Sequence, residues 1–238
     1  MRIYEEPTHA ERVIQELRTN KLSDRDWDEV HASDFFGCLR RTYLDRDEAT
    51  KKPLTRGEVV KFSAGFAIQE WFLGEEPPGI TIEDDKGRPL IFSRDGFDEE
   101  RGLVLEFKTT GRSMKDFDVK ALQEQEEWLV RTRAYCAVFG VRTAVFLVYF
   151  LFQRDFRSFT VVYSDREVKE GLALAKRRGA QLWNAFEKRQ LPGIDTRMSD
   201  LNCYWCPHIS EQCPGQLPAV QRLKQEWASK RKPRKKKT

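Results

Sequence analysis

Two acidic side chains and one amine lie close together near the middle of this chain. Asp95 follows a predicted strand over residues 89–94, and Glu106 and Lys108 lie two residues apart in another over residues 103–108. Because successive side chains of a strand point to opposite faces, Glu106 and Lys108 share one face. A hairpin between the two strands would place Asp95 beside Glu106. Two carboxylates held in this way form a hard oxygen site for Mg²⁺ or Mn²⁺.

Such a site predicts hydrolytic chemistry on a phosphodiester. A metal ion lowers the pKa of a coordinated water, and Lys108 would orient that water or stabilise the developing negative charge. Taken alone, a Glu-x-Lys pair is usually a surface ion pair on a wet sheet face. The preceding Asp95, the apolar alternation and the cysteines described below together favour the catalytic interpretation. The alternation predicts a core-facing set formed by Leu103, Leu105 and Phe107.

Four of the five cysteines form a second group with chemical potential. Cys38 stands alone, whereas Cys203, Cys206 and Cys213 follow the spacing C-x2-C-x6-C. Four thiolates suit either tetrahedral zinc or an iron–sulfur cluster. The long separation of one ligand from the other three favours the cluster. Either centre would close a long loop and stabilise the fold.

Two further residues, Cys136 and His208, are not expected to be ligands of this centre. Cys136 lies on an apolar helix face and is predicted to be a small buried hydrophobe. His208 lies inside the cysteine loop and could replace one cysteine as a ligand, but four thiolates already suffice. The odd number of cysteines favours a reducing, cytoplasmic environment, and the chain shows neither an apolar run of membrane-spanning length nor a signal peptide.

Hydrophobic periodicity predicts the elements that position these residues. One expected helix is capped by Ser33, includes Cys38 and extends to Leu44. The other expected helices cover residues 9–19, 56–73, 115–139 and 165–190, the last of them capped by Asp165. The expected strands cover residues 80–83, 89–94, 103–108, 143–150 and 157–163. The nearly all-apolar segment 143–150 is expected to be a central strand covered on both faces. The order predicts an α/β fold with a mixed central sheet flanked by helices.

The chain length favours one domain, over residues 1–216, followed by a basic, partly disordered tail over residues 217–238. Residues 30–46 and 200–214 would together build the thiolate centre. The net charge is +4, but the segment from Lys230 onward carries seven positive charges and no negative ones. The remainder is therefore net acidic, and nucleic-acid binding would depend on local patches and on the tail.

These motifs together resemble a known group. SRDG, followed by LVLEFKTT and by a helix containing Tyr135, resembles the PD-(D/E)XK nuclease superfamily. HASDFFGCLRRTYL, with the closing C-x2-C-x6-C, resembles its RecB-like iron–sulfur branch, which includes the CRISPR-associated family-four exonucleases and the AddB nuclease domains of DNA repair. The resemblance covers residues 30–214.

The resemblance implies a restriction-endonuclease-like fold in which a [4Fe-4S] cluster on the four cysteines joins the N- and C-terminal parts. It also implies cleavage of DNA, often single-stranded and from an end, with a helicase or CRISPR integrase as a possible partner and no membrane association. By motif position, Asp95 and Glu106 would be ligands of Mg²⁺ or Mn²⁺, Lys108 the catalytic lysine, and Tyr135 a residue near the DNA.

Two positions depart from the family pattern. Gln69 stands where the G-x-x-x-H motif has a metal-binding histidine, and its amide oxygen would be a weaker ligand. Arg131 stands where the Q-x-x-x-Y motif has glutamine, and it is predicted to contact a phosphate. Further phosphate contacts are expected from Arg40 and Arg41, and Trp71 and Trp205 are candidate base-stacking residues.

Three functions remain open at this point. The first is a metal-dependent deoxyribonuclease with an iron–sulfur cluster. The second is a catalytically weak or inactive DNA-binding protein of the same fold, which would retain DNA without cutting it. The third is a zinc-stabilised regulatory or scaffold protein, which would contain zinc and no iron.

Overall fold

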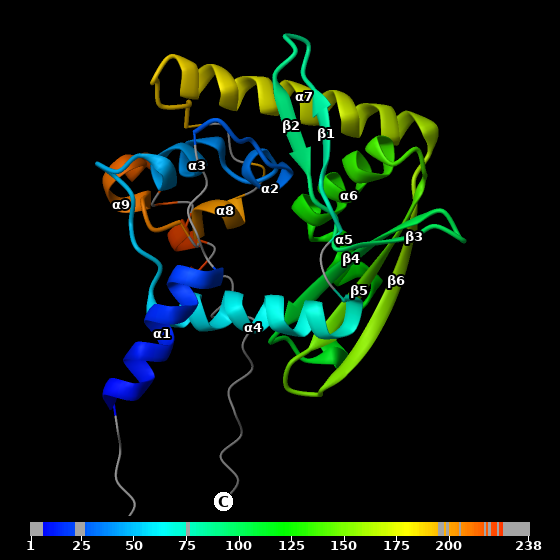
Figure 1. Cartoon of the computed structure of the whole chain (residues 1–238), viewed down its shortest axis with the longest axis horizontal. Helices are drawn as coiled ribbons and strands as arrows, with labels where there is room; N and C mark the ends of the chain where they lie inside the picture. The colour runs from blue at the N-terminus through cyan, green and yellow to red at the C-terminus, as the bar shows by residue number, and fades with distance from the viewer. Residues whose placement is uncertain are drawn as a thin grey trace, which may run out of the picture.

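The computed structural model describes residues 7–21, 27–74, 77–194, 198, 200–204, 206–216, 218, 220–222 and 224–225. Within these residues the chain forms a mixed α/β arrangement of a central sheet, a separate hairpin and flanking helices (Figure 1). The strands are β1 (Ile80–Glu83), β2 (Pro89–Phe92), β3 (Gly96–Asp98), β4 (Leu103–Thr110), β5 (Thr143–Phe150) and β6 (Asp155–Val162). The α-helices are α1 (Pro7–Lys21), α2 (Ala32–Phe35), α3 (Leu39–Arg46), α4 (Arg56–Leu73), α5 (Val119–Gln123), α6 (Glu126–Val138), α7 (Asp165–Glu187), α8 (Asp200–Tyr204) and α9 (Ile209–Gln212). The 3-10 turns are η1 (Met114–Asp116) and η2 (Pro214–Gln216).

The central sheet has the strand order β3-β4-β5-β6. Strands β4 and β5 are parallel, whereas β3 and β6 pair antiparallel with their neighbours, so the sheet is mixed. The apolar strand β5 lies between β4 and β6, and its side chains alternate between fully buried and half-buried. The predicted mixed sheet flanked by helices, with this segment at its centre, is confirmed.

Helices cover both faces of the sheet. On one face, Val104 and Ala144 pack in the same buried cluster as Val130 and Ala134 of α6. On the other face, Phe72 of α4 packs against neighbouring rings of β4 and β6, with centroids 6.4 Å from Phe107 and 4.6 Å from Phe156. The polar residues of β4 therefore lie between two helical layers rather than on a wet face.

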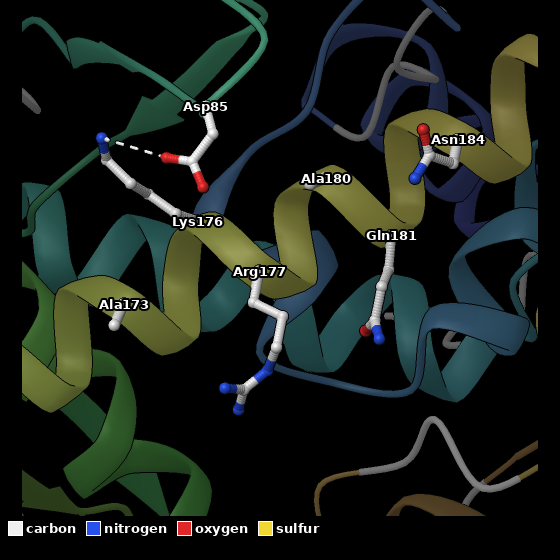
Figure 2. Close-up of a pocket in the computed structure, with 7 residues that line it drawn as sticks. All are labelled: Asp85, Ala173, Lys176, Arg177, Ala180, Gln181 and Asn184. Carbon is white, nitrogen blue, oxygen red and sulfur yellow. Dashed lines mark ion pairs between the residues drawn. The ribbon is translucent and has the colours of Figure 1, made fainter.

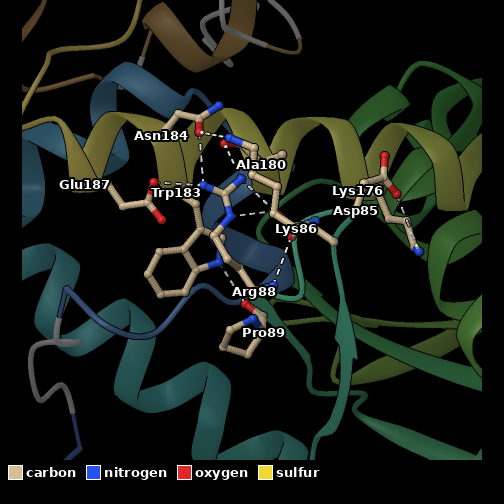
Figure 3. A network of polar contacts seen from close by, with 10 residues as sticks. Asp85, Lys86, Arg88, Pro89, Lys176, Ala180, Trp183, Asn184 and Glu187 are labelled. Carbon is tan, nitrogen blue, oxygen red and sulfur yellow. Dashed lines mark hydrogen bonds and ion pairs between the residues drawn. The ribbon is translucent and has the colours of Figure 1, made fainter.

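The β1–β2 hairpin is attached to α7 by a polar network (Figure 3). Arg88 donates a hydrogen bond to Asn184 Oδ1 (3.0 Å) and forms an ion pair with Glu187 (3.1 Å), and the Trp183 indole N–H donates to the Pro89 carbonyl (2.9 Å). Gly179 allows the close approach, because a Cβ there would overlap Leu90. This attachment fixes the chain shortly before it reaches Asp95.

The segments near the two ends of the chain meet on one side of the sheet, where α3 lies beside α8 and α9 (Figure 1). Arg40 donates to the carbonyls of Pro192 (2.8 Å) and Gln212 (3.0 Å). His208 Nε2 lies 2.6 Å from Asp45 Oδ1. Most of the predicted tail over residues 217–238 lies outside the described residues. No helix in the described ranges is long and apolar enough to cross a membrane.

Several predicted elements are correct, and others need correction. The helix over residues 56–73 and the strands over 80–83 and 143–150 have the predicted bounds. The helix expected from Ser33 is two helices, and Cys38 is the extended N-cap of α3 rather than a helical residue. The helix expected over 115–139 divides into η1, α5 and α6, because Phe117 and Gln125 leave helical geometry. The cap of α7 is Ser164, not Asp165.

The predicted core face of β4 was wrong at two of its three positions, since only Phe107 is buried there as expected. Val104 and Glu106 are fully buried, whereas Leu103 and Leu105 are only half-buried. Alternation separates two sets of side chains, but it cannot say which set is covered when helices lie over both faces. Glu106 is therefore a buried carboxylate, which raises its chemical significance.

Candidate active site

Asp95 occupies the place where a strand ends early. Strand β3 pairs with β4 only as far as Gly96 opposite Leu105. The next outward amide of β4, on Phe107, donates instead to Asp95 Oδ2 at 2.6 Å. The carboxylate thus completes the edge of β4 and is held in a fixed position there. This backbone bond explains why Asp95 lies beside Glu106, as the sequence predicted.

Glu106 and Lys108 meet Asp95 on this part of β4. Glu106 Oε1 lies 2.5 Å from Lys108 Nζ, and Lys108 Nζ lies 3.7 Å from Asp95 Oδ2. Lys108 also donates to the Phe107 carbonyl at 2.8 Å. The second oxygen of Glu106, Oε2, is buried and has no hydrogen-bond partner within the described residues. The three predicted side chains are therefore brought together, with one carboxylate oxygen left unsatisfied.

Arg131 contributes a second cation from α6. Its guanidinium forms an ion pair with Glu106 Oε1, the oxygen that also faces Lys108. The side chain is largely buried, and its Nε has no hydrogen-bond partner in the described part of the chain. The sequence predicted that Arg131 contacts a phosphate, and its spacing alone did not reveal the contact with Glu106.

The buried charges shift the pKa values of the two acids in opposite directions. Burial, with repulsion from Glu106, raises the pKa of Asp95 to about 6, although Lys108 and Arg131 oppose the shift. Burial would also raise the pKa of Glu106, but the attraction of Arg131 and Lys108 outweighs it and lowers that pKa. Burial opposes the charge on Arg131, yet Glu106 raises the pKa of its guanidinium.

The two other predicted residues, Gln69 and Tyr135, come from different helices, α4 and α6. Gln69 reaches from α4 and places Nε2 3.4 Å from Asp95 Oδ1, which is a long contact. Tyr135 is buried one turn beyond Arg131, and its ring packs 5.7 Å from that of Phe92. Trp128, which the sequence did not single out, places its ring 5.8 Å from Lys108 Nζ. Its position one turn before Arg131 on α6 was the signal that could have identified it.

The donor set fits a hard divalent cation. Among the residues that the structure describes, the buried Glu106 Oε2 has no hydrogen-bond partner and Asp95 Oδ1 has only the long Gln69 contact. A flip of the Gln69 amide would direct its oxygen toward the same space. Within the described residues no three acidic, histidine or cysteine side chains are arranged around one ion. Mg²⁺ is commonly held by one or two carboxylates with several waters, so two carboxylates and an amide are sufficient.

The four predicted cysteine ligands line one small cavity. Cys38 reaches it from the start of α3, and Cys203, Cys206 and Cys213 reach it from the C-terminal segment. The cavity volume is about 10 Å³, enough for one water, and the thiols are not spaced around an ion among the described residues. Burial raises the pKa of Cys206. The four cysteines line one cavity as predicted, and the cluster itself stays a prediction.

Cys136 lies elsewhere, in the core. It is fully buried, and burial raises the pKa of its thiol to about 12, in keeping with a small hydrophobe. The imidazole of His208 is turned to Asp45 and does not line the cysteine cavity.

The residues predicted to contact nucleic acid differ in how accessible their side chains are. Both terminal nitrogens of Arg40 are used by backbone carbonyls, and Arg41 pairs with Asp45 at 3.2 Å. Trp71 is 82% exposed, and its ring stacks on Phe72 at a centroid distance of 5.3 Å. Trp205 lies outside the described residues. The exposed ring of Trp71 is therefore accessible to a base.

A larger open cavity of about 560 Å³ lies along α7, away from these groups (Figure 2). Lys176 on its rim lies 3.9 Å from Asp85, and Arg177 points outward beside it. None of the predicted site residues that the structure describes lines this cavity. Its size therefore does not identify the site of chemistry.

Comparison with solved structures supports the fold. The chain is similar to the crystal structure of SSO0001, with a TM-score of 0.57 and 16% identity over 88% of this chain and 97% of that one. This similarity shows a shared fold. No protein-family model matches the sequence, and no curated protein matches it.

Weaker similarities are found to two exonucleases. The alkaline exonuclease LHK-Exo from Laribacter hongkongensis gives a TM-score of 0.41 and 12% identity over 74% of this chain and 95% of that one. A phage-related exonuclease from Haemophilus somnus 129PT gives a TM-score of 0.38 and 11% identity over 70% of this chain and 98% of that one. These TM-scores are too low to carry an argument about this chain.

Proposed function

We propose that this protein is a Mg²⁺- or Mn²⁺-dependent deoxyribonuclease that hydrolyses phosphodiester bonds. The observation that carries the proposal is the orphaned Oε2 of the buried Glu106, beside Asp95 and 2.5 Å from Lys108 through its other oxygen. A buried carboxylate oxygen without a partner is costly and rare in folded proteins. A cation bound there would remove that cost.

Each residue of the site would have its own role in hydrolysis. Asp95 and Glu106, with the Gln69 amide, would hold the ion, whose chemistry is to lower the pKa of a coordinated water and neutralise phosphate charge. Lys108 stands beside both carboxylates and would orient the attacking water or donate to a phosphate oxygen. The Phe107 amide fixes Asp95 before substrate arrives, so no ordering of that ligand is needed during the reaction.

The finer assignments rest on the resemblance to the RecB-like iron–sulfur branch of the PD-(D/E)XK superfamily. We place a [4Fe-4S] cluster on Cys38, Cys203, Cys206 and Cys213, supported by their common cavity. Single-stranded DNA is the favoured substrate, because an exposed tryptophan stacked on a second ring suits an unpaired base. A cytoplasmic location and a helicase or CRISPR integrase partner belong to the same proposal.

A second candidate, a DNA-binding protein with weak or no catalysis, is favoured by one observation. Glu106 Oε1 already faces two cationic side chains, Arg131 and Lys108, and Gln69 supplies only a neutral amide. Such a site binds a divalent cation more weakly than one without the two cations and with a charged or imidazole ligand in place of the amide. The two candidates differ in whether the bound DNA is cut.

Cleavage of end-labelled single-stranded and duplex DNA tests the proposal. Wild type is expected to cut in Mn²⁺ and not in EDTA, and Lys108→Ala should lose at least about a hundredfold in rate because an electrostatic contact to the transition state is removed. Lys169→Ala, which changes an exposed lysine of α7, is the matched control and should cut like wild type. Retention of DNA without cutting would select the second candidate, and equal cleavage by Lys108→Ala would refute the assigned chemistry.

A further inference from the structure

The oxygens of the two carboxylates are not equivalent. Glu106 Oε1 faces both Arg131 and Lys108, whereas Oε2 has no partner among the described residues. Asp95 Oδ2 accepts from the Phe107 amide, whereas Oδ1 has only the 3.4 Å contact with Gln69. Each acid therefore leaves one oxygen for a ligand.

One oxygen from each acid is enough for a single cation but not for two. Sites with two cations hold them about 3.5–4 Å apart and share a carboxylate between them. Here Oε1 of Glu106, the oxygen that a second cation would need, is already bound by a guanidinium. A second cation would have to displace that buried ion pair, which would leave Arg131 charged in the interior without its counter-charge.

The guanidinium itself retains an unused donor. Arg131 Nε is buried and has no hydrogen-bond partner in the described ranges. A guanidinium presents several fixed donors, so one edge can hold Glu106 while another N–H donates to a phosphate oxygen. The orphaned donor and the orphaned Oε2 of Glu106 lie on side chains that contact each other, so an anion and a cation would be bound side by side.

We propose that Arg131 takes the place of a second divalent cation, so that this site binds one ion and the guanidinium supplies the other positive charge to the phosphate. The inference rests on the proposed nuclease function and specifies which positive charges its site presents to the phosphate. Two carboxylates, Lys108 and Arg131 together have no net formal charge before an ion binds. Removing the guanidinium charge would therefore make the site more attractive to cations.

Mn²⁺ binding in the full-length protein, counted by electron paramagnetic resonance of the free ion, tests the inference without using activity. Wild type should bind one ion, and Asp95→Asn should lose it, which assigns the ion to this site. Arg131→Gln should bind the first ion at least about tenfold more tightly, or bind a second one. Arg131→Lys, which keeps the charge, should bind one ion as wild type does.

Arg142→Gln is the matched control, because it removes the same charge from an exposed pair with Asp165 and should leave Mn²⁺ binding unchanged. Unchanged or weaker binding in Arg131→Gln would overturn the inference. If that variant does not fold, the wild-type count decides, since two ions at the Asp95-dependent site would overturn it. A wild type that cuts DNA with two ions refutes only this inference, whereas tighter binding in Arg131→Gln with no cleavage by wild type refutes only the nuclease.

Discussion

Replacing Asp95 by asparagine should stabilise the metal-free protein above pH 6. The pKa of this carboxyl rises from 3.8 to about 6 on burial beside Glu106. One pKa unit corresponds to about 1.4 kcal/mol, so ionising Asp95 costs the folded state about 3 kcal/mol. Asparagine avoids this cost and keeps an oxygen that can accept from the Phe107 amide.

The sign of the pH dependence follows from proton binding. Between about pH 4 and pH 6 the folded protein keeps the Asp95 proton that the unfolded chain has released. The contribution of this group to stability therefore falls as pH rises through that window and is constant above it. The advantage of Asp95→Asn should appear across the same window and then level off.

Thermal unfolding in EDTA, followed by circular dichroism, measures this difference. For a chain of this size about 1 kcal/mol changes Tm by 2–4 °C, so the variant should melt about 6–12 °C above wild type at neutral pH. Added Mn²⁺ should raise the Tm of wild type and not that of the variant, which reverses or narrows the gap.

Asp155→Asn provides the matched control for this experiment. The Asp155 carboxylate also accepts a backbone N–H, from Phe156 at 2.8 Å, but it lies exposed at the start of β6. Its replacement should change Tm little at any pH. An Asp95→Asn variant that is less stable than wild type in EDTA at neutral pH would refute the account of a destabilised buried carboxylate.

Four further outcomes are expected. Mn²⁺-dependent kcat/KM should fall about tenfold per pH unit below pH 6, because Asp95 must be ionised to hold the ion, and a flat profile would contradict this. Glu106→Gln should abolish cleavage and cost about 3–5 kcal/mol in urea unfolding by leaving Arg131 buried without its counter-charge, whereas unchanged stability would argue against that pair. Trp71→Ala should weaken single-stranded DNA binding by about 1–3 kcal/mol at unchanged Tm, and equal affinity would remove the ring from the DNA path. Anaerobically purified Cys203→Ser should contain much less iron than wild type, and zinc in wild type would support the scaffold alternative.

Local patterns predicted much of the fold. Helix α4 was predicted from the helical spacing of its apolar residues, and in the structure it begins at a Thr55 capping box completed by Glu58. The apolar run of β5 indicated a central strand, and it is one. The breaks within residues 33–44 and 115–139 were missed because they depend on tertiary contacts. For example, Asp34 Oδ2 accepts from Arg46, and this contact joins α2 to α3 across Gly37.

The site was predictable in its members but not in its contacts. Alternation placed Glu106 and Lys108 on one face, and the preceding acid was correctly expected beside them. Nothing in the sequence showed that helices cover both faces of β4, so the burial of Glu106 was not foreseen. The ion pair with Arg131 was missed for the same reason, since it depends on how α6 lies over the sheet.

The position of Mn²⁺ in a crystal of the protein, located by its anomalous scattering, tests the central claim most directly. The account predicts one peak about 2 Å from oxygens of Asp95 and Glu106, with Lys108 beside it. The absence of a peak there, or Mn²⁺ bound only at other residues, would contradict the claim that these two carboxylates hold the catalytic ion.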